Sequence, residues 1–227
     1  MVNAGFSLVL IILHHYLVAS SCLQMRLRGR EWDRPLHRVC SSVEDLDSLD
    51  ATESTPTIPT FLPSLRGVDY VPLATMLATG DFKAADQFTR DNLIKISGAA
   101  DKGRSFVYFT EVQNIPSVDL ATMERLWLDF SNGQFGYSVQ KRAWDLENGH
   151  FDNFIRRIGW TTTEDGRERK LKWFGANEFI YDVSKAPKGH LPLTSALRGT
   201  QLMKQLMAHP VWTQYDWRNY KDLQWDP

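Results

Sequence analysis

Apolar side chains recur at helical spacing in the middle of the chain, and this periodicity limits the possible folds more than any other feature. The first set consists of Tyr70, Leu73, Met76 and Leu77. Residues spaced by three and four positions lie on one face of an α-helix. Asp69 precedes the set as a candidate N-cap, and Gly80 follows it as a residue suited to a helix C-terminus. The pattern therefore predicts a short helix.

A second helix is predicted to begin after Asp81, a good N-cap residue. Its apolar stripe comprises Phe82, Ala85, Phe88 or Thr89, Leu93 and Ile96. The opposite face is expected to hold Lys83, Asp86, Arg90 and Lys95. Because an apolar stripe is buried against a neighbouring element, we expect the two helices to pack as a hairpin.

Further helical segments follow, and together they predict an all-α fold, a compact multihelical core. One begins at Ser117 or Asp119 and ends at Asn132 and Gly133. The others are expected at 138–146, 151–158 and 197–207. Between Trp160 and Thr194 the helical period is lost and a loop is predicted. The mixed charges of 164–170 are interpreted as part of this loop.

The ends of the chain have the composition of targeting and linker segments. Residues 1–23 combine a short apolar run with small residues near position 20, which is typical of a signal peptide; an uncleaved anchor or an incorrect start site is the alternative. Residues 24–60 form an arginine-rich, transit-like stretch, or a plain basic arm, followed by an acidic linker with prolines. The folded core is predicted at 61–217, with a short tail at 218–227. This organisation predicts import into a plastid.

Composition and motifs exclude several classes of function. The formal net charge is −1, and the basic residues are dispersed, so we expect no nucleic-acid partner. Cys22 and Cys40 both precede the core. Phosphate-binding, nucleophile-elbow and zinc-protease motifs are absent from the sequence. His150, His190 and His209 are far apart and lack other metal-ligand types at ligand spacing. We therefore expect no catalytic residues and no metal site.

The second half of the core is rich in aromatic residues, including several in the predicted loop. A loop is a poor place to bury this much ring surface unless it covers a flat, apolar ligand. A tetrapyrrole fits this requirement, because its macrocycle favours ring faces and its propionates favour guanidinium groups. A purely structural role for the aromatic residues is the simpler alternative.

Several short sequence blocks resemble those of a known family and follow one another in the same order. They include Gly67–Tyr70, Thr89–Asp91, Phe109–Val112, Ser131–Gln140, Ile158–Trp160, Gly189–Leu193, Leu197–Gly199 and His209–Trp212. In this respect residues 67–217 resemble the genomes-uncoupled-four family of tetrapyrrole-binding regulators of magnesium chelatase. The resemblance implies a helical cup whose concave face, closed by long loops, binds protoporphyrin IX and Mg-protoporphyrin IX as ligands.

The resemblance also implies a role and a set of ligand contacts. The protein would be a non-catalytic activator of magnesium chelatase in the plastid stroma, with the large porphyrin-binding subunit of that enzyme as its partner. We expect a monomer and leave peripheral membrane association open. The expected ligand contacts are Phe135, Tyr137, Val139, Arg142, Phe174, Phe179, Leu191, Pro192, Leu193, Ser195, Leu197 and Arg198. Arg198 is the first candidate for a propionate partner.

Two departures from the family pattern leave alternatives. Gln201 stands where many members carry a second arginine, and Ser195 stands where they often carry asparagine. One charge contact to a porphyrin is therefore in question. The alternatives are a sensor or carrier of another tetrapyrrole, such as haem or a bilin, and a helical protein-interaction scaffold that binds no pigment.

Overall fold

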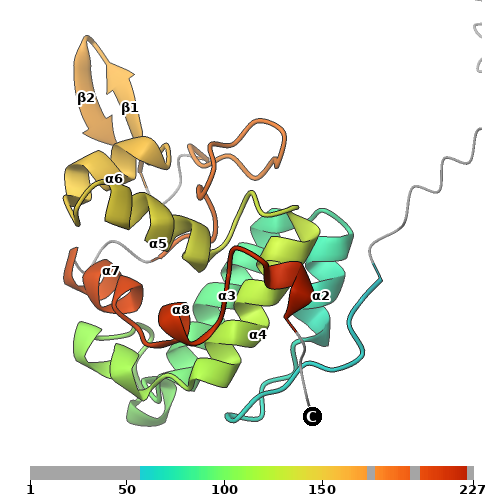
Figure 1. Ribbon diagram of the computed structural model, residues 1–227. Helices are drawn as coiled ribbons and strands as arrows, with labels where there is room; N and C mark the ends of the chain where they lie inside the picture. Colours follow the sequence, from blue (N-terminus) through green and yellow to red (C-terminus); the bar gives the residue numbers. More distant parts are fainter. Residues whose placement is uncertain (1–56, 173–176, 195–199, 224–227) are drawn as a thin grey trace, which may run out of the picture. The chain divides into compact units, whose positions relative to one another are not determined.

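The computed structural model describes residues 57–172, 177–194 and 200–223, and it is mainly helical (Figure 1). The first helices are α2 (Val71–Ala78), α3 (Phe82–Ile96), α4 (Ser117–Phe130), α5 (Tyr137–Leu146) and α6 (Phe151–Arg157). The antiparallel strands β1 (Thr161–Glu164) and β2 (Arg167–Lys170) come next, before α7 (Thr200–Met207) and α8 (Val211–Gln214). Short 3₁₀ turns lie at Ala100–Lys102, Phe109–Asn114 and Tyr220–Asp222. The predicted all-α class is confirmed, with one small hairpin added.

The helices α2 and α3 pack against each other as predicted (Figure 1). Asp81 is the N-cap of α3, and its carboxylate accepts a hydrogen bond of 3.0 Å from the Ala84 amide. At the start of α2 the prediction was one residue off, because Tyr70 is the N-cap. Asp69 instead accepts a hydrogen bond from the Val71 amide.

The face of α3 that is buried is wider than its apolar stripe. Asp86 was expected on the solvated face, but it is fully buried. Thr89 is also buried and accepts a hydrogen bond of 3.0 Å from the Trp127 indole of α4. The placement of Asp86 on the polar face is therefore wrong. A buried carboxylate must be matched by hydrogen bonds or a cation to be tolerated, and both are present here.

The helix α4 has more buried residues than a single apolar stripe along one helix face predicts. Leu120, Met123, Leu126 and Trp127 are fully buried, and so are the acidic residues Asp119 and Glu124. The helices α2 and α8 both pack against α4, which increases the number of its buried positions. Asn132 and Gly133 then have positive φ angles of 50° and 72°, which end the helix where the sequence indicated.

The segment 160–194 contains a β-hairpin that sequence analysis assigned to a loop. Thr161 pairs with Lys170 and Glu164 with Arg167. The turn is formed by Asp165 and Gly166, whose φ angles are 52° and 74°. Two consecutive positive φ angles match a type I′ turn, for which Asp-Gly is a preferred pair. The Asp-Gly pair was therefore a local signal for the hairpin. The strands were missed because neither face of the hairpin is fully buried, so the residues of both strands are mostly polar.

Candidate ligand-binding site

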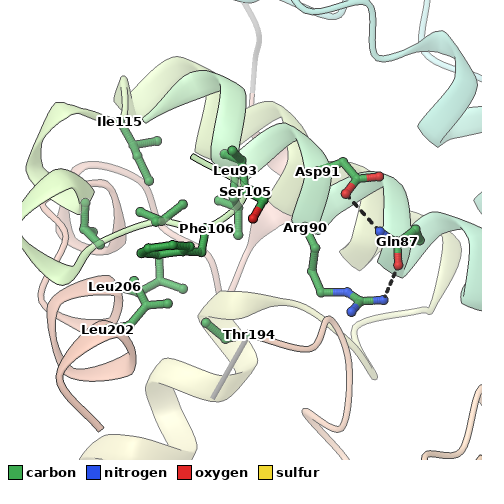
Figure 2. Close-up of a pocket in the computed structure, with 13 residues that line it drawn as sticks. Gln87, Arg90, Asp91, Leu93, Ser105, Phe106, Ile115, Thr194, Leu202 and Leu206 are labelled. Carbon is green, nitrogen blue, oxygen red and sulfur yellow. Dashed lines mark hydrogen bonds between the residues drawn. The ribbon is translucent and has the colours of Figure 1, made fainter. Parts of the chain in front are cut away.

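An apolar pocket of about 230 Å³ lies between α3, the segment 105–115 and α7 (Figure 2). Its apolar wall is formed by Leu93, Ile94, Phe106, Val107, Val112, Ile115, Leu202 and Leu206. Its polar wall is formed by Gln87, Arg90, Asp91, Ser105 and Thr194. Small-molecule sites usually measure about 300–1,000 Å³, so a flat macrocycle would be only partly enclosed by these residues.

Three separate elements meet to form the apolar wall. The 3₁₀ turn Phe109–Asn114 packs against α7, which brings Leu202 and Leu206 opposite Phe106. Val112 and Ile115, which also line the pocket, are almost completely buried. Because these residues are already fixed by the core, the wall is largely preformed, which lowers the entropic cost of binding a ligand.

One polar network on α3 forms the other end of the pocket. The Gln87 amide nitrogen donates to Asp91 Oδ1 at 2.9 Å, and Arg90 Nη2 donates to Gln87 Oε1 at 2.7 Å (Figure 2). The Arg90 side chain is 26% exposed and is an ion-pair partner of Asp86, with 3.1 Å between Nε and Oδ2. The pocket therefore joins an apolar wall to an oriented guanidinium group.

Asp86 connects this network to the segment that precedes α7. Its Oδ1 accepts a hydrogen bond of 2.6 Å from the Leu193 amide, so α3 holds the backbone next to Thr194. Burial raises the pKa of Asp86 to about 7, although the Arg90 charge and the Leu193 hydrogen bond both favour the ionised form. The carboxyl group is thus close to its titration point at neutral pH.

A second buried carboxylate fixes the start of α5. Glu124 accepts hydrogen bonds from the Tyr137 amide at 2.6 Å and the Ser138 amide at 2.9 Å. These are donors that an α-helix N-terminus leaves without intrahelical partners. Gly136 approaches the same carboxylate so closely that a Cβ there would lie 2.5 Å from Glu124 Oε1. Burial raises the pKa of Glu124 to about 7.

Most sequence-predicted ligand contacts that the structure describes lie in the hydrophobic core. The buried members are Phe135, Tyr137, Val139, Leu191, Pro192 and Leu193, with Phe179 at 9% exposure. None of them lines the pocket, whereas Thr194, the next residue along, does. Pro192 follows a cis peptide bond, and its carbonyl accepts a hydrogen bond of 2.8 Å from Gln140. Their contact with a ligand stays a prediction.

The remaining predicted contacts divide into two groups. Arg142 is half-buried. Burial lowers the pKa of its guanidinium group, and the charge of Glu124 partly offsets this effect. Phe174, Ser195, Leu197 and Arg198 lie outside the described residues. The chain on either side of 195–199 reaches the pocket, through Thr194 before it and Leu202 after it. Gln201 is exposed on α7.

Sequence reasoning missed the residues that line the pocket. Arg90 was placed on the solvated face of its helix, and Gln87 and Phe106 were not considered. A usable signal was present: Gln87, Arg90 and Asp91 lie within one helical turn, and Phe106-Val107 is an apolar pair directly before the Phe109–Val112 block. Only the packing of α7 against this region shows that they share a cavity.

The two buried histidines have structural partners. His190 Nδ1 lies 2.8 Å from the Ile158 carbonyl, and its Nε2 accepts a hydrogen bond from the Ile180 amide. His209 Nε2 lies 3.0 Å from the Ile115 carbonyl. Within the described residues no group of His, Cys, Asp and Glu is arranged to hold a metal ion. In the same part of the chain, no helix has the length and apolar character needed to cross a membrane.

Comparison with known proteins gives the family of this chain. Residues 63–210 match the model of the family described as GUN4-like. The chain belongs to the GUN4-like family. It is 42% identical over 156 residues to a Ycf53-like protein of Synechocystis sp., which covers 69% of this chain and 64% of that protein. It is 38% identical over 146 residues to the chloroplastic tetrapyrrole-binding protein of Arabidopsis thaliana, which covers 63% of this chain and 55% of that protein.

Two solved structures of GUN4-like proteins share the fold. The structure of GUN4 from Chlamydomonas reinhardtii is 42% identical, has a TM-score of 0.59 and aligns over 67% of this chain and 95% of its own. The ligand-free structure of Arabidopsis thaliana GUN4 is 36% identical, with a TM-score of 0.58, and aligns over 66% and 99% respectively. The present chain spans less than two thirds of the length of the full-length relatives named above.

Proposed function

We propose that this GUN4-like chain binds protoporphyrin IX and Mg-protoporphyrin IX in the pocket between α3 and α7. The observation that carries the proposal is the combination of an apolar wall with one oriented guanidinium group. A porphyrin needs both, because its macrocycle is apolar and its propionates are charged. The name of the Arabidopsis relative, a tetrapyrrole-binding protein, supports the same ligand class.

The residues of the pocket fit such a ligand by their chemistry. Phe106, Leu202 and Leu206 would contact the face of the macrocycle, and Arg90 would lie at its acidic edge. Arg198, with Ser195 and Leu197 beside it, is proposed to contribute from the segment that joins Thr194 to α7. The core residues predicted from the sequence, including Phe135 and Tyr137, would support the wall from behind.

We further propose that the protein is a non-catalytic activator of magnesium chelatase and acts through the large porphyrin-binding subunit of that enzyme. The support is membership of the GUN4-like family. A plastid location is proposed from the arginine-rich segment at 24–60 and from the chloroplastic relative. A carrier of this kind delivers a poorly soluble pigment and needs no reacting side chain of its own.

A fluorescence titration tests the binding proposal. Deuteroporphyrin and its magnesium complex should quench the tryptophan emission of the purified protein with a saturable dependence on concentration. Phe106→Ala should weaken binding roughly tenfold, because an aromatic wall contact of about 1–1.5 kcal/mol is lost. Phe109→Ala is the matched control, since Phe109 is 44% exposed and does not line the pocket.

Three results would contradict parts of the proposed function. The absence of saturable quenching with either pigment would exclude the pocket as a porphyrin site. An unchanged rate of magnesium insertion, measured with the chelatase subunits and added protein, would exclude the activator role alone. An equal effect of Phe106→Ala and Phe109→Ala would place binding elsewhere on the protein.

Binding of another tetrapyrrole is the second candidate. Gln201 carries no charge at a position where the family resemblance implies arginine, and it is exposed at the start of α7. The loss of one charged contact to the ligand would alter the preference among tetrapyrroles, including haem and bilins. A competition titration among haem, biliverdin and Mg-deuteroporphyrin separates the candidates, and preference for the magnesium porphyrin would dismiss this one.

A further inference from the structure

Among the described residues that line the pocket, Arg90 alone carries a positive charge. Its side chain extends from α3 toward the segment with Thr194, at the other end of the pocket from the Phe106 ring (Figure 2). The Arg90 side chain is 26% exposed and lines the pocket, so part of it is accessible to a ligand. A guanidinium group in this position can contact an acidic group of a ligand in the pocket without a change in the position of α3.

Two neighbours on α3 hold this guanidinium in place. Gln87 accepts from Nη2 at 2.7 Å and is itself held by Asp91, which accepts from the Gln87 amide nitrogen at 2.9 Å. The planar guanidinium is therefore oriented before any ligand arrives. Orientation in advance reduces the conformational entropy lost on binding, so more of the interaction energy is available for affinity.

The ion pair that Arg90 forms with Asp86 is close but not aligned. The distance between Nε and Oδ2 is 3.1 Å, yet neither atom has a hydrogen bond of acceptable geometry among the described residues. Asp86 is fully buried, whereas Arg90 reaches the pocket. The two charges attract each other, so a second carboxylate that pairs with Arg90 would weaken the interaction between Arg90 and Asp86.

The surroundings of Asp86 determine how firmly it retains its negative charge. The Leu193 amide donates to it, Arg90 faces it from its own helix, and the Tyr137 and Tyr181 hydroxyls face it from α5 and from the segment after β2. The pKa of the Tyr137 hydroxyl is raised mainly by burial, and the charges of Asp86 and Glu124 raise it further. Among the described residues, Arg90 is the cation that acts on Asp86, so within this part of the chain the two side chains balance each other's charge.

We infer that Arg90 recognises a carboxylate of the ligand and that Asp86 is a positioning residue that competes with the ligand for the same guanidinium. This inference rests on the proposed porphyrin-binding function and names the group that selects an acidic macrocycle. When a propionate pairs with Arg90, Asp86 loses part of its charge compensation. Because burial already places its pKa at about 7, Asp86 then takes up a proton.

The test compares an acid with its ester in the full-length chain. Deuteroporphyrin and deuteroporphyrin dimethyl ester share a macrocycle and differ in charge. We expect the wild-type protein to bind the acid more tightly, and Arg90→Met to reduce that preference about tenfold or more, because a charge-assisted hydrogen bond contributes about 1.5–3 kcal/mol. Arg156→Met is the matched control, since Arg156 pairs with Glu168 of the hairpin and does not line the pocket.

Asp86→Asn provides a second test with the opposite expected sign. Asparagine keeps an oxygen for the Leu193 amide but removes the competing charge, so the preference for the acid should increase. Arg90→Met leaves a buried carboxylate without its cation, so the double variant Asp86→Asn, Arg90→Met serves if the single variant does not fold. The double variant should bind the ester like wild type and show the reduced acid preference.

Calorimetry in buffers of different ionisation enthalpy measures the accompanying proton. Between pH 6 and 8 the wild-type protein should take up a fraction of one proton for each deuteroporphyrin bound. Asp86→Asn should abolish this uptake. The inference is overturned if the wild-type protein binds both pigments but the two substitutions leave the acid preference unchanged or move it in the same direction. If the wild-type protein binds neither pigment, the proposed function itself fails.

Discussion

Glu124 illustrates how one buried carboxylate gives this fold a pH dependence. Its pKa is raised to about 7 by burial, from an ordinary value of 4.5. In the unfolded chain the group loses its proton near pH 4.5, whereas the folded protein retains the proton up to about pH 7. The stabilisation is therefore complete below pH 4.5 and is lost progressively as the pH rises to about 7.

Glu124→Gln should remove this dependence while keeping an acceptor for the Tyr137 and Ser138 amides. Urea unfolding between pH 5 and pH 8 measures the difference in unfolding free energy between wild type and variant. We expect wild type to lose stability relative to the variant as the pH rises through this window. Parallel curves for the two proteins would show that Glu124 does not titrate as stated.

Gly136 is the second residue at which a single change is informative. Its φ angle is 138°, and an added Cβ would lie 2.5 Å from Glu124 Oε1. Gly136→Ala should lower the unfolding free energy by roughly 2–4 kcal/mol, because backbone strain and displacement of a buried carboxylate add together. Gly166→Ala is the control, with φ of 74° and open space around the position, and should cost only about 1 kcal/mol. Equal losses would contradict the steric argument.

At the level of elements, the start of α3 depends on one side chain. The Asp81 carboxylate accepts from the Ala84 amide, which has no intrahelical partner of its own. Asp81→Ala should lower the melting temperature and cost about 1 kcal/mol of stability. Thermal unfolding by circular dichroism measures this, with exposed Asp101→Ala in the 3₁₀ turn as control. An unchanged melting temperature for Asp81→Ala would show that the cap is not used.

The β1–β2 hairpin depends on its neighbours through exposed ion pairs. Arg156 of α6 binds Glu168 through two hydrogen bonds of 2.8 Å, and Lys170 lies 3.3 Å from Asp152. All four side chains are at least 41% exposed. Pairs of this kind contribute at most about 1 kcal/mol. These two ion pairs therefore make only a minor contribution to the stability of the fold.

At the scale of the whole molecule, a short segment before α2 belongs to the folded unit. Ser64, the Leu65 amide and the Tyr70 hydroxyl all donate to the fully buried Asp119 of α4. The Thr122 hydroxyl also donates to the Pro63 carbonyl at 2.7 Å. Residues 63–70 thus close one side of α4, although they contain no regular secondary structure.

This arrangement predicts where the chain tolerates truncation. A fragment beginning at Phe61 should melt at the same temperature as the full chain. A fragment beginning at Val71 should lose at least about 3 kcal/mol, because Asp119 would be buried without its donors. Circular dichroism of both fragments checks the prediction. Equal melting temperatures for the two fragments would show that the Asp119 network is dispensable.

The amino-acid sequence alone predicted α2 to α7, with approximate ends, and the family, whereas α8 and the short 3₁₀ turns were not predicted. The apolar periodicity of α2 to α6, the Asp81 cap and the Asn132-Gly133 terminus are local signals, and local signals suffice because helical hydrogen bonds are themselves local. The ordered motif blocks from Gly67 to Trp212 gave the family resemblance that the comparisons confirmed. The proposed roles of Arg198 and its neighbours stay predictions.

Tertiary structure alone decided which side chains share a cavity and which charges are buried. Asp86 looks like a surface residue in the helical pattern, but Leu193, far along the chain, supplies its hydrogen bond. Phe106 and Leu206 line the same pocket because α7 packs against the 3₁₀ turn at 109–114. Contacts between residues so distant in sequence cannot be predicted from the spacing of apolar residues, because that spacing depends only on positions within one helix or strand.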